Sequence, residues 1–467
     1  METKPNKLKQ APMELYLEMS LEDLRDVLSL TIKHDHTNKI VVFLAMLSAY
    51  TDSSQINVSL NAPSSTGKSF LAIEIAKLFP ADDKVERSGA SPTAFFYEAG
   101  VPIFKKVKGS EEKQVVGRLV SLERKILLFY EQPDPQLQAK LRALLSHDSR
   151  DLKYSFTNRK GGKNQADHVV LRGYPSSIFC SAGMILDEQE ATRAILLSPE
   201  ATDEKILAGI QSQARRSANA DEYNGWLNSQ QERIDLMSRI VAIRDEKVNE
   251  IIVPNPDGVN DKFRELFPIA KPRHMRDISH LVQLIKSITL LNVWHRTAED
   301  GKIYATQKDV DEGFELWSAI SESQEYNLPP AVLRFYKDII VPAYLEKYEK
   351  GNYELKQDME YDKIGLTPQE LNNYHIKALE KPMNSEQVRK QILPQLENSG
   401  LIVQEKPTKD FSDKRTRHIF PKSLTEENQL KNIGSGGSRH SAIDGLDDET
   451  YALFFGGQRN SDPTPDK

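Results

Sequence analysis

The sequence has a single cysteine, Cys180, among 467 residues. One thiol cannot form an intramolecular disulfide or build a cysteine-based zinc site, which excludes disulfide chemistry and structural zinc of that kind. The sequence also has no apolar run approaching the roughly 18–20 residues of a membrane-spanning helix, and its first ten residues lack the apolar centre of a signal peptide. These absences predict a soluble, cytoplasmic protein with no membrane contact.

A strong excess of one charge is also missing. The chain carries 62 Lys and Arg against 68 Asp and Glu, a net charge of −6, which excludes a highly basic protein that coats DNA. The charge is unevenly distributed along the chain. The last 44 residues (424–467) contain eight acids and four bases, so the rest of the chain has a net charge of only −2. Local basic clusters in that nearly neutral remainder can still bind DNA.

Short β-prone runs alternate with amphipathic segments in the first half of the chain. The runs lie at 56–60, 84–89, 125–130 and 176–182. This alternation predicts an α/β fold in which helices cover a parallel sheet. The predicted organisation is an N-terminal helical segment (1–50), a core with hairpin insertions (51–200), a helical subdomain without strands (201–325), a helix-rich domain ending in two strands (326–423) and a flexible acidic tail (424–467).

Residues 62–69, APSSTGKS, match the phosphate-binding pattern G-x-x-x-x-G-K-[ST], with Ala62 in place of the first glycine. The β-prone run before them and the helical run after them are the context that this loop requires. The pattern predicts an ATP and Mg²⁺ site, in which Lys68 binds the β/γ-phosphates and the Ser69 hydroxyl binds Mg²⁺. The backbone of the preceding residues is predicted to surround phosphate: Ala62, Pro63, Ser64, Ser65, Thr66 and Gly67.

An acidic motif at the end of a second core strand is expected to hold Mg²⁺ and orient the attacking water. KILLFYEQPD (125–134) supplies it in one of two registers. Either Glu131 is the catalytic base, or Glu131 binds Mg²⁺ and Gln132 replaces the base. We favour the second register, because the apolar strand then extends through Tyr130; water activation is then weak or depends on another group, such as Asp134.

Residues 56 to about 320 resemble the AAA+ core of the MCM-type replicative helicases. The resemblance lies in the order of APSSTGKS, VERSGASPTAF, EQPD and a long insertion before the strand at 176–182. It implies a P-loop NTPase sheet with a helical lid. Only about 50 residues precede the core, which is more like the short helicases of plasmids, phages or integrative elements. Ala62 and Gln132 depart from the usual residues, which puts the hydrolysis rate in question.

The same resemblance implies roles for polar residues outside the loop. Ser181, or alternatively Ser177, would lie near the attacking water at the end of its strand. Arg193 would reach the γ-phosphate of a neighbouring subunit, unless it is an ordinary solvated arginine. Arg273 and Arg276 lie three residues apart in KPRHMRD, and either could close over the nucleotide as a second sensor.

Two segments resemble the DNA-contacting hairpins of this family. Residues 149–175 form two β-prone arms around a basic tip that contains Arg159, Lys160 and Lys163. Residues 101–117 carry Lys105 and Lys106 and resemble an insertion in the second helix of that group. Exposed hairpins with merely solvated charges are the alternative for both.

The 326–423 segment resembles a winged helix-turn-helix. Its expected recognition helix (385–400) would turn Val388, Ile392, Leu393 and Leu396 inward, while Arg389 and Lys390 face outward. The wing carries Lys414 and Arg415, and contact with either the DNA backbone or a protein fits this pattern. In the tail, the acidic and aromatic residues at 444–455 predict a partner-docking peptide or a segment that packs back on its own chain.

The resemblance implies an ATP-dependent, ring-forming and hexameric DNA helicase or translocase, acting on single-stranded or forked DNA in the replication of a mobile element. The alternative is an ATP-gated DNA-binding loader, recruiter or regulator with little unwinding activity. A phage-defence ATPase is a further variant of that alternative.

Overall fold

The computed structural model describes residues 15–87, 100–106, 113–160, 163–181, 192–299, 301–350, 365–406 and 416–422. By its internal contacts the chain divides into two compact units, Met1–Pro329 and Pro330–Lys467. The first unit contains the loop 62–69, the sheet around it and the helices that follow. The second contains the C-terminal helices and a two-stranded hairpin.

A five-stranded parallel sheet forms the centre of the first unit, as the alternation of β-prone and helical runs predicts. The strands at 176–181 and 57–61 are buried along their whole length, which explains their nearly continuous apolar or small side chains. In spatial order the strands are β2 (Lys84–Arg87), β5 (Ile126–Phe129), β8 (Ser176–Ser181), β1 (Asn57–Asn61) and β9 (Ile195–Leu197).

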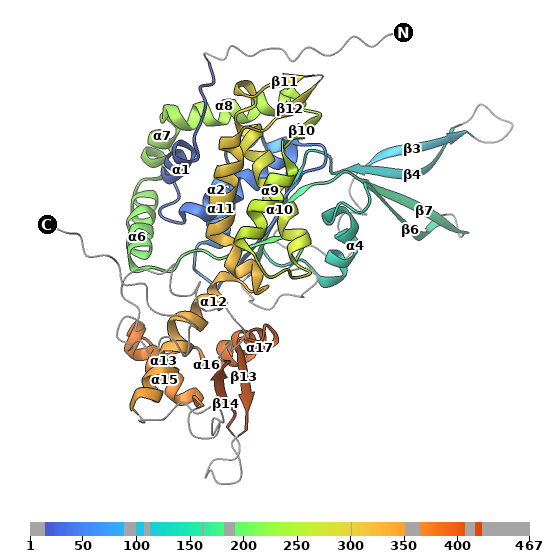
Figure 1. Ribbon diagram of the computed structural model, residues 1–467. Coiled ribbons are helices and arrows are strands. Elements are labelled where there is room, and N and C mark those ends of the chain that lie inside the picture. The colour runs from blue at the N-terminus through green and yellow to red at the C-terminus, as the bar shows by residue number, and fades with distance from the viewer. Residues whose placement is uncertain are drawn as a thin grey trace. The chain divides into compact units, whose positions relative to one another are not determined.

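Helices cover this sheet and connect it to the rest of the unit (Figure 1). Nine residues of α2 are buried, so this helix lies inside the main core with residues of α10 and α11 rather than at its surface. No helix in the described ranges has both the length and the apolar character needed to cross a bilayer. The helices of this part of the chain are α1 (Leu21–Ser29), α2 (His36–Leu47), α3 (Lys68–Ala76) and α4 (Pro135–Leu145).

The predicted strand-free subdomain after residue 200 is mostly helical, but it also contains a small sheet. This sheet has the order β10 (Glu250–Ile252), β12 (Lys302–Tyr304) and β11 (Ala298–Glu299), so the prediction that no strand interrupts the helices is wrong. Strands of two or three residues give too short a pattern to recognise. The helices are α6 (Asp203–Ala218), α7 (Ala220–Asn228), α8 (Gln231–Glu246), α9 (Pro256–Leu266), α10 (His274–Leu291) and α11 (Gln307–Glu325).

The two predicted hairpins are present, and they share one four-stranded sheet. The strands are β3 (Val101–Lys106), β4 (Lys113–Ser121), β7 (Lys163–Arg172) and β6 (Asp151–Lys160). Strands β4 and β7 pair in parallel and join the hairpins, which leave the body of the unit on the same side (Figure 1). Gly173 has a φ of +103°, and a Cβ there would lie 2.6 Å from the backbone nitrogen of Glu123. Only glycine allows this close approach at the root of the hairpin sheet.

The second unit has the element order helix, bridge, helix, helix and hairpin. Leu366 pairs with Ile419 of the hairpin. Two helices contain π-helical segments, Tyr336–Ile340 and Val388–Ile392, each followed two residues later by a proline that offers no N–H to the helix. The elements are α12 (Pro330–Phe335), α13 (Val341–Lys350), α15 (Pro368–Leu379), α16 (Ser385–Gln387), α17 (Leu393–Asn398), β13 (Ile402–Glu405) and β14 (His418–Pro421).

Candidate nucleotide site

The loop 62–67 begins at the carboxyl end of β1, where the order of the sheet reverses. From β1 the chain goes to β2 at one edge of the sheet, whereas from β8 it crosses β1 to reach β9 at the other edge. The carboxyl ends of β1 and β8 therefore flank a crevice of the kind in which parallel α/β sheets bind ligands. Ser181, the last residue of β8, pairs with Asn61 at the end of β1.

The loop has the backbone geometry of an anion cradle. Gly67 has a φ of +91° and immediately precedes α3, and Ser65 has a φ of +67°. Gly67 has no side-chain oxygen that could cap the helix, so the first-turn N–H groups and the positive end of α3 are directed at the loop. Ala62 is buried, with 1% of its surface exposed, so its methyl group is accommodated at the start of the loop.

Lys68 folds back over the loop that precedes it. Its Nζ donates to the carbonyl oxygens of Ala62 at 2.7 Å and Pro63 at 2.6 Å. The side chain is buried, and burial lowers the pKa of the ammonium. A phosphate in the loop would give this buried cation an anionic partner, which two carbonyl dipoles replace only in part.

Oxygen ligands for Mg²⁺ are few at this edge. Ser69 follows Lys68 on α3, and its hydroxyl hydrogen-bonds to the buried Cys180 thiol, whose pKa burial raises to about 11. Glu131 is exposed just beyond the end of β5. Among the described residues there is no group of three or more acidic, His or Cys side chains suited to a metal. An ion here would therefore be held by Ser69, Glu131 and the nucleotide phosphates. Mg²⁺ sites commonly combine one or two protein ligands with substrate phosphates.

Gln132 is joined to the end of the neighbouring strand. The Ser181 Oγ donates to Gln132 Oε1 at 2.8 Å, and Ser181 is buried with 3% of its surface exposed. This bond fixes the orientation of the glutamine amide and directs its NH₂ group away from Ser181. Asp134 instead caps α4 by accepting from the Gln136 N–H at 2.7 Å. Asp134 is therefore engaged at the start of α4, whereas the Gln132 amide lies beside Ser181 at the carboxyl end of β8.

We expect Gln132→Ala to lower kcat for ATP hydrolysis by about 10–100-fold, because a positioned water loses its orienting amide. The KM for ATP is expected to stay within about twofold, since Gln132 is not part of the phosphate loop. Steady-state kinetics of the variant, beside Gln136→Ala as an exposed-glutamine control, measures both values. An unchanged kcat would remove Gln132 from the site.

A second cation near the loop was not predicted from the sequence. The Lys205 Nζ in the first turn of α6 donates to the Thr66 carbonyl at 3.3 Å and forms an ion pair with the buried carboxylate of Asp35. The other end of α6 is attached to α3, because Arg216 pairs with Glu74 at 3.2 Å. Both ends of α6 thus contact the loop-and-helix element that would bind phosphate. Lysines at surface helix starts are common, so only the fold could identify Lys205.

Arg193 and Arg276 lie at the opposite edge of the sheet from Lys68. Arg193 precedes β9, and its Nε donates to Ser146 Oγ at 2.7 Å. Arg276, in the first turn of α10, donates to the neighbouring Thr192 hydroxyl. Strand β1 lies between this edge and the loop, and the four steps from its first to its last Cα span roughly 13 Å at 3.3 Å per residue. In this structure neither guanidinium reaches the loop of its own chain.

Arg273 has a structural role in this arrangement. Its side chain is 8% exposed and pairs with Asp277 at 3.0 Å, while its other nitrogens donate to Gln324 at 3.1 Å and to Asn327. Gln324 in turn bonds the backbone N–H and C=O of Leu196 on the edge strand β9. The expectation that Arg273 closes over the nucleotide is therefore not supported by its position, since its partners fix α10 and α11 to the sheet.

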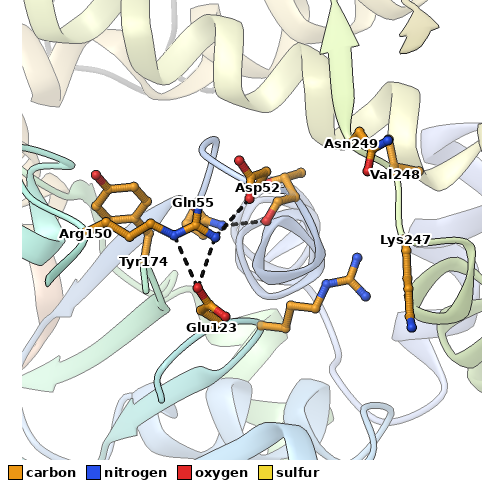
Figure 2. Close-up of a pocket in the computed structure, with 10 residues that line it drawn as sticks. Asp52, Gln55, Glu123, Arg150, Tyr174, Lys247, Val248 and Asn249 are labelled. Carbon is orange, nitrogen blue, oxygen red and sulfur yellow. Dashed lines mark hydrogen bonds and ion pairs between the residues drawn. The ribbon is translucent and has the colours of Figure 1, made fainter. Parts of the chain in front are cut away.

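A cavity of about 420 Å³ lies at the amino-terminal edge of the sheet, away from the phosphate loop. Arg150 forms ion pairs there with Asp52 at 3.1 Å and Glu123 at 3.0 Å, and Lys247 stands on the opposite wall (Figure 2). Asp52 lies in the segment that leads into β1, whereas Glu123 and Arg150 lie at the root of the hairpin sheet. Arg150 therefore attaches the hairpin sheet to the core, and the cavity is not the nucleotide site.

The predicted DNA-contacting residues are distributed over both units. The backbones of Lys160 and Lys163 pair at the tip of β6 and β7, with Arg159 beside them, and Lys105 and Lys106 lie at the outer end of β3. In the second unit the four apolar residues predicted to face inward are buried, and Arg389 and Lys390 are exposed. Lys414, Arg415 and the tail 424–467 lie outside the described residues.

No family model matches the sequence, and no curated protein matches it. Among solved structures, the chain is similar to the crystal structure of a full-length MCM homolog from Methanopyrus kandleri, at 13% sequence identity and a TM-score of 0.36. The similarity covers 66% of this chain and 63% of that protein, so the match spans less than two thirds of its length. At these values the similarity concerns the fold at most.

Proposed function

We propose that this protein is an ATP-dependent DNA helicase or translocase that works as a ring of identical subunits, in the replication of a mobile element. ATP and Mg²⁺ would bind at the crevice between β1 and β8. DNA would be moved by the basic tips of the hairpin sheet. A hexamer is the expected assembly, because the resemblance to MCM-type helicases in motif order implies it.

The observation that carries the proposal is the meeting of three sequence motifs at the carboxyl edge of one parallel sheet. Three different strands supply these motifs: the phosphate loop with Lys68, the Gln132 amide and the Ser181 hydroxyl. The Ser181 hydroxyl donates to the Gln132 amide oxygen at 2.8 Å. Lys68 would neutralise phosphate charge and Gln132 would orient the attacking water, which is the division of labour that phosphoryl transfer requires.

The location of Arg193 and Arg276 supports a site shared between subunits. A transition state for phosphoryl transfer is stabilised by an arginine, and the two candidates lie at the sheet edge opposite their own loop. A head-to-tail ring joins two different surfaces of neighbouring copies, and in the proposed ring these would be the edge with Arg193 and the phosphate loop. Hydrolysis would then require assembly.

The hairpin sheet supports contact with DNA. Lys160 and Lys163 face each other in register at one tip, and Lys106 faces Lys113 at the other. Ring symmetry would repeat both clusters around a central channel and sum their fields, so a chain with net charge −6 needs no further basic surface to attract phosphates.

We expect the double substitution Lys160→Ala/Lys163→Ala to lower strand separation of forked DNA at least tenfold, while ATP hydrolysis without DNA is unchanged. The salt dependence of single-stranded DNA binding should also weaken, by about 0.7 in the log–log slope for each phosphate that the variant no longer neutralises. Lys302→Ala/Lys308→Ala removes two exposed lysines from the helical subdomain and is the charge-matched control. Normal unwinding by Lys160→Ala/Lys163→Ala would exclude a role of these two lysines in strand separation.

The second candidate function is an ATP-gated loader or regulator that assembles on DNA with little turnover. Gln132 favours it, because an amide orients water but does not accept a proton as a carboxylate does. ATP turnover and strand separation, both measured on forked DNA, distinguish the two functions. Rapid DNA-stimulated turnover with unwinding identifies the motor, whereas ATP-dependent assembly with slow turnover and no unwinding identifies the loader.

A further inference from the structure

Helix α6 presents its apolar side to solvent and its polar side to the protein. Its half-buried residues recur three or four positions apart and so define one inward face: Lys205, Ala208, Ser212 and Arg216. None of the sixteen described residues of this helix is buried. Ile206, Leu207 and Ile210 are between 49% and 66% exposed, and we call these three residues the α6 face. An ordinary surface helix turns its apolar stripe to the core, so this reversed pattern indicates a contact surface.

The inward residues fix α6 beside the phosphate loop, at the margin of the first unit (Figure 1). The first turn contacts the loop through the hydrogen bond from Lys205 to Thr66, and the last turn contacts α3 through Arg216 and Glu74. The Arg216 guanidinium also lies 5.0 Å from the ring centroid of Phe70 in the first turn of α3. The α6 face therefore belongs to a helix that is attached at both ends to the candidate nucleotide site.

A second exposed apolar surface lies where α9 is followed by α10. Leu266, Ile269 and Met275 are between 42% and 74% exposed. The Phe267 and His274 rings pack beneath them with their centroids 5.0 Å apart, which holds the end of α9 against the start of α10. Residues 266–276, here called the corner, thus form a fixed turn with apolar side chains on its outside.

The corner and the α6 face lie at different edges of the sheet and have different charges. Arg276 donates to the Thr192 hydroxyl, so the corner adjoins the edge where Arg193 lies, opposite the phosphate loop. Residues 266–276 contain three bases and no acid, and within the described residues no ion pair involves Arg276. The first turn of α6 instead exposes Asp203 and Glu204. Two separate apolar patches with oppositely charged rims fit a contact between two copies of the chain.

We propose that the α6 face of one copy packs against the corner of the next copy. This inference rests on the proposed ring of identical subunits and identifies the surfaces that join it. The contact is heterologous, so each copy would use its α6 face for one neighbour and its corner for the other. The apolar side chains would form the centre of the contact and Arg276, Asp203 and Glu204 its charged rim. The neighbour's corner would then lie against the helix that contacts the phosphate loop.

Cross-linking between two cysteine variants tests this contact, because the one native cysteine, Cys180, is only 2% exposed. Full-length Leu207→Cys and Met275→Cys proteins are mixed with a slowly hydrolysed ATP analogue and treated with a short bismaleimide. The mixture should form covalent dimers, whereas each variant alone should stay monomeric on a denaturing gel. Leu207→Cys mixed with Val241→Cys, which alters an exposed apolar residue of α8, measures cross-linking by random collision.

Sedimentation of Leu207→Lys/Ile210→Lys tests the same contact without a cross-linker. The concentration needed for assembly should rise at least about tenfold, because two ammonium groups would be buried in an apolar interface. Ile234→Lys/Met237→Lys places the same charges on α8 and should assemble as the wild type does. Nucleotide affinity of the separated subunits should be unchanged, since the inward face of α6 is intact, and this shows that the variant folds.

The outcomes distinguish failure of this contact from failure of the proposed function. Wild-type protein that stays monomeric with the ATP analogue and forked DNA overturns the proposed ring and the contact together. Wild-type assembly overturns only the contact if cross-linking does not exceed the Val241→Cys level, or if Leu207→Lys/Ile210→Lys assembles normally. Cross-linking of Leu207→Cys to itself would show that two α6 faces meet each other, which also contradicts the inference.

Discussion

Lys68→Ala is expected to lower the rate of ATP hydrolysis by on the order of 10²–10³-fold, because it removes the cation that would stabilise charge on the transferred phosphoryl group. Nucleotide affinity should fall as well, since the loop loses its one buried ammonium in contact with residues 62–63. A phosphate-release assay at saturating ATP measures the first effect, and titration with a fluorescent ATP analogue measures the second.

Two controls show whether the loss of hydrolysis is specific to Lys68. Lys77→Ala removes a lysine at the end of the same helix, 51% exposed and paired with Glu74, and should leave hydrolysis near the wild-type value. Circular dichroism and thermal unfolding of Lys68→Ala show whether the loop variant still folds. Wild-type turnover by a folded Lys68→Ala protein would exclude the loop as the phosphate site.

Arg193→Ala is expected to lower kcat by about 10³-fold or more while leaving nucleotide binding nearly unchanged, because an arginine finger acts on the transition state. The location of Arg193 at the edge opposite its own loop makes this a test of action between subunits. Turnover should also depend on protein concentration in the wild type, since a separated subunit would lack its arginine. Hydrolysis in a size-fractionated dilution series measures that dependence.

The control for Arg193→Ala is Arg264→Ala, which alters an exposed arginine of α9. The Arg193 bond to Ser146 also has a structural component, so Ser146→Ala separates the two roles. If Ser146→Ala reduces turnover as strongly as Arg193→Ala, the arginine stabilises the fold of its own subunit. A small effect of Ser146→Ala is expected.

The sequence predicts the centre of the first unit because its signals are local. A β-prone run, a loop with Gly67 and Lys68 and an amphipathic run are contiguous, and the structure has strand, loop and helix at these places. The hairpins of the insertions are also local, because each pairs neighbouring segments. Burial of the inward residues of the helix at 385–398 follows from helical periodicity in the same way.

What the sequence did not predict depends on contacts between distant segments. Strand β9 has three residues, too few for a pattern, and is held at the sheet edge by Gln324 from more than a hundred residues away. The pairing of β4 with β7, which joins two hairpins, is equally long-range. The contacts of Arg273 are long-range in the same way, because Gln324 of α11 and Asn327 just after that helix lie over fifty residues further along the chain.

The central claim is that a nucleotide site of one copy is completed by an arginine of another, and mixing two inactive variants tests it most directly. Lys68→Ala keeps Arg193, and Arg193→Ala keeps the phosphate loop. An equimolar mixture should recover about a quarter of wild-type ATP hydrolysis with forked DNA, because in a randomly assembled ring half of the intact loops have an intact arginine beside them. A mixture no more active than the sum of the two separate variants would contradict the account.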